Sequence, residues 1–256
     1  ATVAAHTSWQ HTFLIFGGIG IAYSFVLIAL LFEKKTYKVE PAVKEGFAKE
    51  ASNSLKGIAV LFTNIAFWVM LFYFAALNLP GWTTKNWLPT MLSESLNMPM
   101  DKAGPIATMA LAMSSFVGVF FGGWLSDKWV KKTVRGRVYT SSTGLAMIIP
   151  ALILMNFGGS LFSAILSAAI FGLGFGMYDT NNMPILCQFI SAKYRATAYG
   201  VMNMVGVFAG AAVTQVLGAW TDGGNLGMGF AMLSIVVAAA LALQLFCLKP
   251  KTDNME

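Results

Sequence analysis

The stretch that decides the fold is GGWLSDKWVKKTVRGR, residues 122–137, a charged segment in a chain that is otherwise mostly apolar. It holds Asp127 and five cations, whereas only 11% of the 256 residues are charged and 57% are hydrophobic. Soluble domains carry about 25% charged residues. Long apolar segments lie on both sides of this stretch, so we expect it to be a turn between two membrane-spanning helices.

The same search for long uncharged segments predicts seven transmembrane helices. Residues 138–178 contain no charge, which is too long for one span, and they divide near residues 155–160 into two helices. The second of these continues through Asp179 to about residue 190. The Pro80-Gly81 pair predicts a broken helix followed by a turn. The other predicted spans are residues 13–32, 57–84, 103–126, 196–221 and 223–248.

No segment alternates like a porin strand, so the fold class is an all-α polytopic membrane protein. It consists of one helix plus a bundle of six. The predicted divisions are an outer segment with the first helix, a polar central loop, the six-helix bundle and a short tail. They cover residues 1–32, 33–56, 57–248 and 249–256, respectively.

The cations fix a predicted orientation. All Lys and Arg residues except Lys85 and Lys102 fall in loops on one side of this arrangement. Cytoplasmic loops of membrane proteins are enriched in Lys and Arg. We therefore expect a multi-pass protein of the cell (inner) membrane, with its N-terminus outside and its C-terminus cytoplasmic. The cations do not form one continuous face with interleaved aromatic residues, so nucleic acid is not an expected partner. The lipid bilayer is an expected partner.

The loop GWLSDKWVKK, residues 123–132, resembles the G-x-x-x-D-(R/K)-x-G-(R/K)-(R/K) signature of the major facilitator superfamily. Gly123, Asp127, Lys128, Lys131 and Lys132 match this pattern. Val130 stands where the family usually has Gly. The signature follows the second helix after the long polar loop. The resemblance therefore implies helices six to twelve of a twelve-helix transporter, with the N-terminal helical bundle missing from this chain.

Three other stretches resemble the anion:cation symporter branch of that family, which carries sugar acids and other organic anions. They are residues 11–35, WLPTML at 87–92 and AKYRATAYGVMN at 192–203, in which Arg195 stands at the cytoplasmic start of the sixth span. This resemblance implies a secondary active transporter of a small polar organic solute that works by alternating access. Coupling to protons or sodium is expected.

Asp127 is the predicted gating residue of the loop. A carboxylate at a membrane helix end can bond to a neighbouring helix N-terminus or an arginine, and breaking that contact would open the cytoplasmic side. The alternative is that the loop only enforces topology, since its cations also attract anionic lipid head groups.

Asp179 is the acidic residue placed well within a predicted span. Ionised carboxylates are costly in hydrocarbon, so such a residue normally faces a cavity or a partner. We expect Tyr178 and Asn182, four residues apart, to form one substrate-binding cavity face, with Asp179 available for ion coupling. A structural hydrogen-bond cluster nearer the cytoplasmic end is the alternative.

On the second span, a break at Pro80-Gly81 would let Asn78 and Trp82 reach the cavity as further substrate-binding residues. Lys85 could attract an anionic substrate there, or it could be an interfacial anchor beside the neighbouring tryptophans. Glycine pairs at a spacing of four on three spans predict close helix packing.

No catalytic motif is apparent, so we do not expect an enzyme. Cys187 and Cys247 are far apart and lack metal-ligand spacing, and no cofactor or metal site is predicted. The chain starts without Met or a basic segment, which suggests that it begins inside a larger protein. The alternative function is a truncated membrane protein that binds a ligand or partner without transport.

Overall fold

The computed structural model describes residues 8–31, 58–157, 159–222 and 226–250. The chain divides into two units, Ala1–Asn53 and Ser54–Glu256, and each is described by itself. The whole of the predicted central loop, residues 33–56, lies outside the described residues, as do residues 251–256 of the predicted tail.

The described residues form long helices and no strand. The first unit holds α2 (Trp9–Leu31), which is apolar along its length. In the second unit a short 3₁₀ helix, η1 (Ala192–Tyr194), precedes α8. Within the described part of the chain, seven helices are long and apolar enough to cross a membrane, which confirms the predicted fold class. The six long helices of the second unit are α4 (Ile65–Ser95), α5 (Met100–Val130), α6 (Gly136–Asn156), α7 (Leu161–Phe189), α8 (Arg195–Asp222) and α9 (Leu226–Cys247).

The helix break predicted at Pro80-Gly81 is wrong. α4 continues through both residues to Ser95, and its N-cap is Asn64, whose side chain accepts a hydrogen bond from the Ala66 backbone N–H (2.9 Å). Proline removes one helical hydrogen bond, but neighbouring helices can hold a membrane helix straight past it. Here Pro80 and Gly81 are buried, and the Phe175 ring of α7 lies against Gly81.

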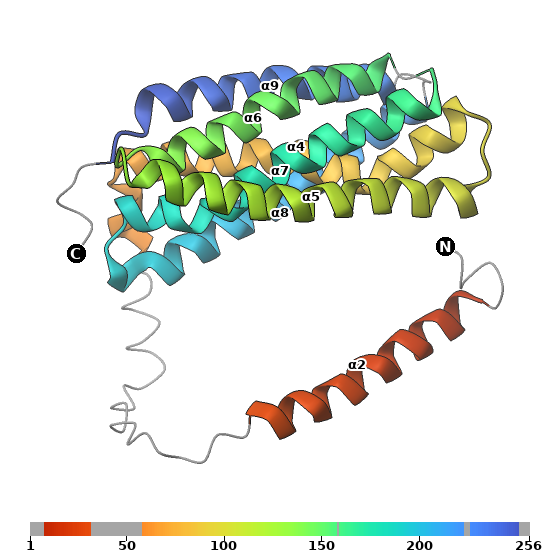
Figure 1. Ribbon diagram of the computed structural model, residues 1–256, viewed down its shortest axis with the longest axis horizontal. Helices are drawn as coiled ribbons and strands as arrows, with labels where there is room; N and C mark the ends of the chain where they lie inside the picture. The colour runs from red at the N-terminus through yellow and green to blue at the C-terminus, as the bar shows by residue number, and fades with distance from the viewer. Residues whose placement is uncertain (1–7, 32–57, 158, 223–225, 251–256) are drawn as a thin grey trace. The chain divides into compact units, whose positions relative to one another are not determined.

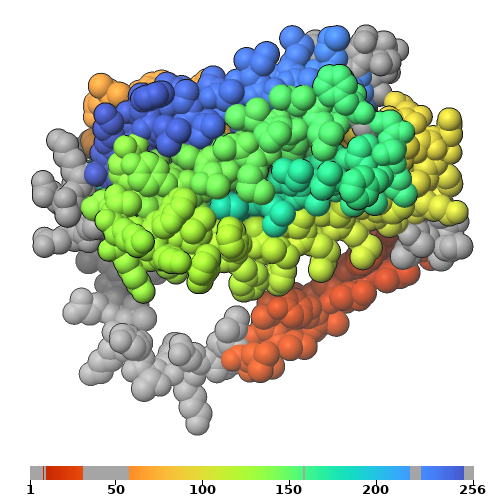
Figure 2. Space-filling model, turned by 45° about the horizontal axis from the view of Figure 1, so that its top comes forward, coloured from red at the N-terminus to blue at the C-terminus, as the bar shows by residue number. Residues whose placement is uncertain are grey.

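Successive helices of the second unit alternate in direction, so the connections at 131–135 and 190–194 lie at the same end, together with the end of α9 (left in Figure 1). We call this the basic end. Within this unit, α5 packs against α7, α6 packs against α7 and α9, and α4 packs against α8. Figure 2 shows α9 and α6 side by side across one face of this unit.

The most extensive helix contact is between α5 and α7, and it depends on glycine. A Cβ atom at Gly118 would clash with the Leu173 carbonyl oxygen, and one at Gly176 would meet the Val119 backbone nitrogen at 2.7 Å. Backbones can approach this closely only where side chains are absent. The predicted close packing is confirmed for the pairs Gly118–Gly122 and Gly172–Gly176, and it brings α5 and α7 together beside the pocket described next.

Candidate functional site

A pocket of about 380 Å³ lies between α4, α5 and α7. Such a volume falls within the range of small-molecule sites, which are typically about 300–1,000 Å³. The walls combine hydrophobic side chains with a few polar groups. The lining residues are Lys85 from α4; Thr108, Leu111, Ala112 and Ser115 from α5; and Phe171, Gly172, Phe175 and Asp179 from α7.

The pocket contains one cation and one carboxylate from facing helices. The Lys85 ammonium nitrogen lies 5.3 Å from the centroid of the Phe175 ring, and Asp179 follows Phe175 by four residues on the same helix face. Lys85 therefore lines the same pocket as Asp179. Two opposite charges in a mostly apolar cavity can orient a ligand that carries a carboxylate at one end and hydrogen-bond donors at the other.

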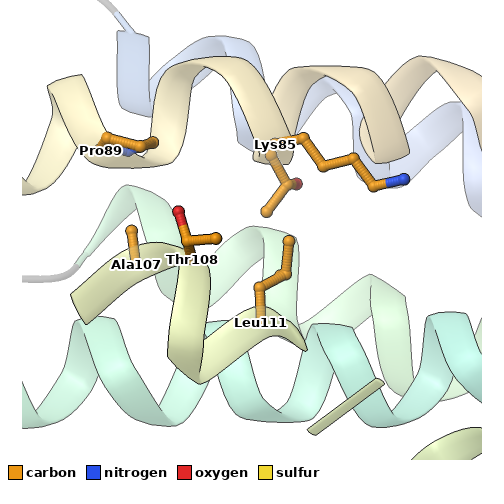
Figure 3. Close-up of a pocket in the computed structure, with 6 residues that line it drawn as sticks. Lys85, Pro89, Ala107, Thr108 and Leu111 are labelled. Carbon is orange, nitrogen blue, oxygen red and sulfur yellow. The ribbon is translucent and has the colours of Figure 1, made fainter. Parts of the chain in front are cut away.

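A second, smaller pocket of about 80 Å³ adjoins the first and shares Lys85, Thr108 and Leu111 with it. Figure 3 shows Lys85 and Pro89 on one side of this small pocket and Ala107, Thr108 and Leu111 on the other. Thr84 also lines it; the Thr84 side chain is buried and its hydroxyl has no hydrogen-bond partner.

Tyr178 and Asn182 lie behind the pocket wall and not on it. Both are almost fully buried, at 1% and 2% exposure, and neither lines the two pockets. The Tyr178 ring packs against the Tyr73 ring of α4, with centroids 5.2 Å apart. The face of α7 that lines the pocket therefore differs from the predicted one: it carries Phe175 and Asp179, not Tyr178 and Asn182. A direct substrate contact by Tyr178 or Asn182 stays a prediction.

Behind Asp179, a chain of hydrogen bonds crosses three helices. The Asn182 side-chain amide donates to Asp179 Oδ1 (3.3 Å), and the Tyr73 hydroxyl donates to Asn182 Oδ1 (2.7 Å). The Ser141 hydroxyl of α6 lies 3.1 Å from the Tyr73 hydroxyl. Asp179 is therefore the exposed member of a mostly buried polar network.

Asn78 and Trp82 pack against α8. The Asn78 amide donates to the Phe74 carbonyl of its own helix (2.9 Å), and its side chain lies against Gly206. Trp82 lies against Gly210 and stays 39% exposed. Neither residue lines the two pockets. Because α4 is unbroken, these side chains do not turn toward the pocket as the predicted break would allow, and a substrate contact by either remains a prediction.

The signature loop, residues 123–132, lies at the basic end, but only its last two residues belong to the connection, because α5 continues as a helix to Val130. The Asp127 carboxylate is 3.9 Å from the Arg137 guanidinium, and the Asp127 side chain is 74% exposed. Lys128 lies over the Trp124 ring, 5.1 Å from its centroid. Asp127 thus has a partner within its own hairpin and remains open to another. Its gating role stays a prediction, as do those of Gly123, Lys131 and Lys132.

Other polar side chains at the basic end bond to backbone carbonyls. Arg195 donates through Nε to the Ile190 carbonyl (3.1 Å) and through Nη2 to the Cys187 carbonyl (3.0 Å), both at the C-terminus of α7. Gln188 donates to the Val134 carbonyl (3.1 Å), and Arg135 donates to the Leu245 carbonyl of α9. Carbonyls at a helix end lack intrahelical partners, so the bonds to Cys187, Ile190 and Leu245 satisfy such groups, and the bond to Val134 ties α7 to the connection before α6.

Sequence reasoning missed Phe175, Tyr73 and Ser141 as parts of this region. Phe175 and Asp179 are separated by four residues, which is the spacing that places side chains on one helix face. That signal was available. Tyr73 and Ser141 gave none, because their contacts with Asn182 join residues far apart in the chain.

Comparisons with known proteins were consistent with this architecture. A family model described as Major Facilitator Superfamily matches residues 1–214. A D-galactonate transporter of Escherichia coli is 25% identical over 252 residues, covering 91% of this chain and 56% of the relative. A probable galactarate/D-glucarate transporter of the same species is 21% identical over 267 residues, covering 92% of this chain and 56% of the relative. The chain spans about half the length of these relatives.

The fold is also similar to that of a solved structure. A bacterial homolog of the human lysosomal transporter Spinster, crystallised in an inward-facing and unoccupied conformation, superposes with a TM-score of 0.65 at 16% sequence identity. The match covers 96% of this chain and 60% of that one. At this identity, the likeness concerns the arrangement of the helices.

Proposed function

The chain belongs to the major facilitator superfamily, and from this premise we propose that it is the C-terminal portion of a secondary active transporter for a sugar acid or a related organic anion. The observation that carries the proposal is the presence of Lys85 and Asp179 in one pocket between apolar helices. Charged side chains within membrane spans are costly and mark substrate and ion pathways. The transporters of galactonate and of galactarate or glucarate among the relatives favour this class of substrate.

Each charge has a proposed role. Lys85 binds the carboxylate of the substrate, because an ammonium group in a cavity of low polarity attracts an anion strongly. Asp179 binds the coupling cation, a proton or sodium, which offsets the charge of the anion during transport. The aromatic and aliphatic walls hold the carbon chain, and Ser115 and Thr108 offer hydroxyls to its polar groups.

Transport further requires a second helical bundle on the other side of the substrate. Alternating access in this class of transporter is a rocking of two bundles around a central site. We infer that the second bundle lies outside this chain and that the signature loop, through Asp127, contacts it at the cytoplasmic side. In this arrangement the N-terminus of the chain is outside and the C-terminus is inside, in the cell (inner) membrane. Nothing in the described residues favours the alternative of a non-transporting binding protein.

The experiment is uptake of labelled D-galactonate by cells that express the complete reading frame encoding this chain, measured with and without an imposed proton or sodium gradient. Asp179→Asn is expected to abolish gradient-driven uptake, because its side chain cannot bind the coupling cation as a carboxylate does. Exchange of internal for external substrate needs no net ion movement and should persist. Unchanged driven uptake in Asp179→Asn would remove the coupling role, and no uptake of any hexonate or hexarate by the wild type would remove the substrate class.

A further inference from the structure

We propose that Ser141, Tyr73 and Asn182 form a relay of hydrogen bonds that holds the Asp179 carboxylate in the orientation needed to bind the coupling cation. In the following, these three residues are called the relay, and they are positioning residues, since none of them lines the pocket. The proposal rests on the proposed function, because it concerns how Asp179 performs its part in coupling.

The direction of the donors in the relay follows from the hydrogen-bonding capacity of each group. A tyrosine hydroxyl has one proton, and Tyr73 donates it to Asn182 Oδ1 at 2.7 Å. The Ser141 hydroxyl, 3.1 Å away, must then be the donor to the Tyr73 oxygen. Because the Asn182 carbonyl is occupied by Tyr73, only the NH₂ group of Asn182 faces Asp179, where it donates to Oδ1 at 3.3 Å. Every donor points toward the carboxylate.

Burial makes this arrangement stiff. The exposed fraction is 0% for Ser141, 1% for Tyr73 and 2% for Asn182. Water cannot replace a lost partner at such positions, so reversing any one amide or hydroxyl would leave buried polar groups unsatisfied. The three residues also come from α6, α4 and α7, so the orientation of Asp179 depends on the packing of three helices.

The consequence for Asp179 is that its two oxygens differ. Oδ1 accepts from the Asn182 amide, while Oδ2 has no bond to the relay and is left for a ligand. Since the relay presents only an N–H group, it cannot take a proton from Asp179. A coupling cation must therefore reach Asp179 from the pocket, on the side that Lys85 shares.

The test separates coupling from folding by comparing driven uptake with exchange. Tyr73→Phe removes the hydroxyl and keeps the ring, so the Asn182 carbonyl loses its donor and the amide is no longer held in one orientation toward Asp179. In the complete protein we expect gradient-driven uptake per folded molecule to fall about five- to tenfold, the size expected for losing one hydrogen bond between uncharged groups such as Tyr73 and Asn182. The exchange rate and its KM should stay within about twofold of wild type.

The matched control is Tyr199→Phe, the same chemical change on α8, where the ring lies beside Phe74 outside the relay. It should leave both activities unchanged. Asn182→Ala breaks the relay at its last bond and should reproduce the Tyr73→Phe split. It decides the question if Tyr73→Phe does not yield folded protein, as measured by the monodisperse fraction in detergent.

Driven uptake equal to wild type in both relay variants would overturn the proposal. An equal fall in driven uptake and exchange would overturn it too, because packing alone would then explain the effect. The Asp179→Asn variant distinguishes the two levels of inference: if it keeps driven uptake, the proposed coupling role fails. If it loses driven uptake while the relay variants do not, only the relay fails.

Discussion

The pocket and the basic end of the bundle both concentrate polar side chains, but these side chains differ in what they contact. At the basic end, Arg195, Gln188 and Arg135 each bond to backbone carbonyls and join neighbouring elements. In the pocket, Lys85 and Asp179 line a cavity and keep a side open to it. Polar groups that bond to the backbone of a neighbouring element stabilise the fold, whereas groups left open in a cavity are available to a ligand.

This difference predicts separate consequences for mutation. Substitutions in the pocket should change transport and leave stability nearly as it was, and substitutions at the basic end should do the reverse. Three variants can sharpen or break the comparison.

The largest effect is expected for Lys85→Met, which keeps the length of the side chain and removes its charge. Loss of a charge-assisted contact with an anionic substrate should raise the KM about 10- to 100-fold, corresponding to roughly 1.5–3 kcal/mol. The measurement is the concentration dependence of D-galactonate exchange. Lys102→Met, in the exposed first turn of α5, is the control and should leave KM unchanged. A wild-type KM in Lys85→Met would show that the carboxylate binds elsewhere.

An intermediate effect, on stability, is expected for Arg195→Met. It removes the two donors to the Cys187 and Ile190 carbonyls, so the C-terminus of α7 loses its side-chain partners. The cost should be about 1–3 kcal/mol of unfolding free energy, seen as a lower Tm of the purified protein. Lys193→Met, at an exposed neighbouring position, should not lower the Tm. If Arg195→Met raised the substrate KM at an unchanged Tm, the division between the two regions would be wrong.

The smallest effect is expected for Thr84→Val, at the small pocket. The buried Thr84 hydroxyl has no partner, so replacing it by a methyl group of similar size removes an unsatisfied polar atom. The free energy of unfolding should stay the same or rise by about 1 kcal/mol at most, seen as an equal or slightly higher Tm. The KM should stay within about twofold of wild type. Thr83→Val is a matched control, because that hydroxyl is also buried and unpartnered but lines neither pocket. A much higher KM in Thr84→Val alone would show that the small pocket binds a substrate hydroxyl.

Much of the fold was predictable because a bilayer imposes one requirement on every span. About 20 apolar residues are needed to cross it, and its backbone must be hydrogen-bonded within the helix. The seven spans and the all-α class followed from this requirement and are confirmed. The break at Pro80-Gly81 was mispredicted because local propensity in α4 was outweighed by the helices packed around it.

The site was only partly predictable. A carboxylate within an apolar span made Asp179 conspicuous, whereas the sequence context of Lys85 allowed two interpretations, and only the structure places it in a pocket with Asp179. The faces of α7 could not be assigned, because consecutive helical residues differ by about 100 degrees and several neighbours of Asp179 are polar.

The sequence by itself determined the number of spans, the charged stretch where α5 meets α6 and the presence of a carboxylate among apolar residues. These are properties of short segments and of the solvent around them. Only the tertiary structure decided that Asp179 and Lys85 share a pocket and that Tyr73 and Ser141 stand behind Asn182. These contacts join α4, α6 and α7, and they depend on how closely glycine lets neighbouring helices approach.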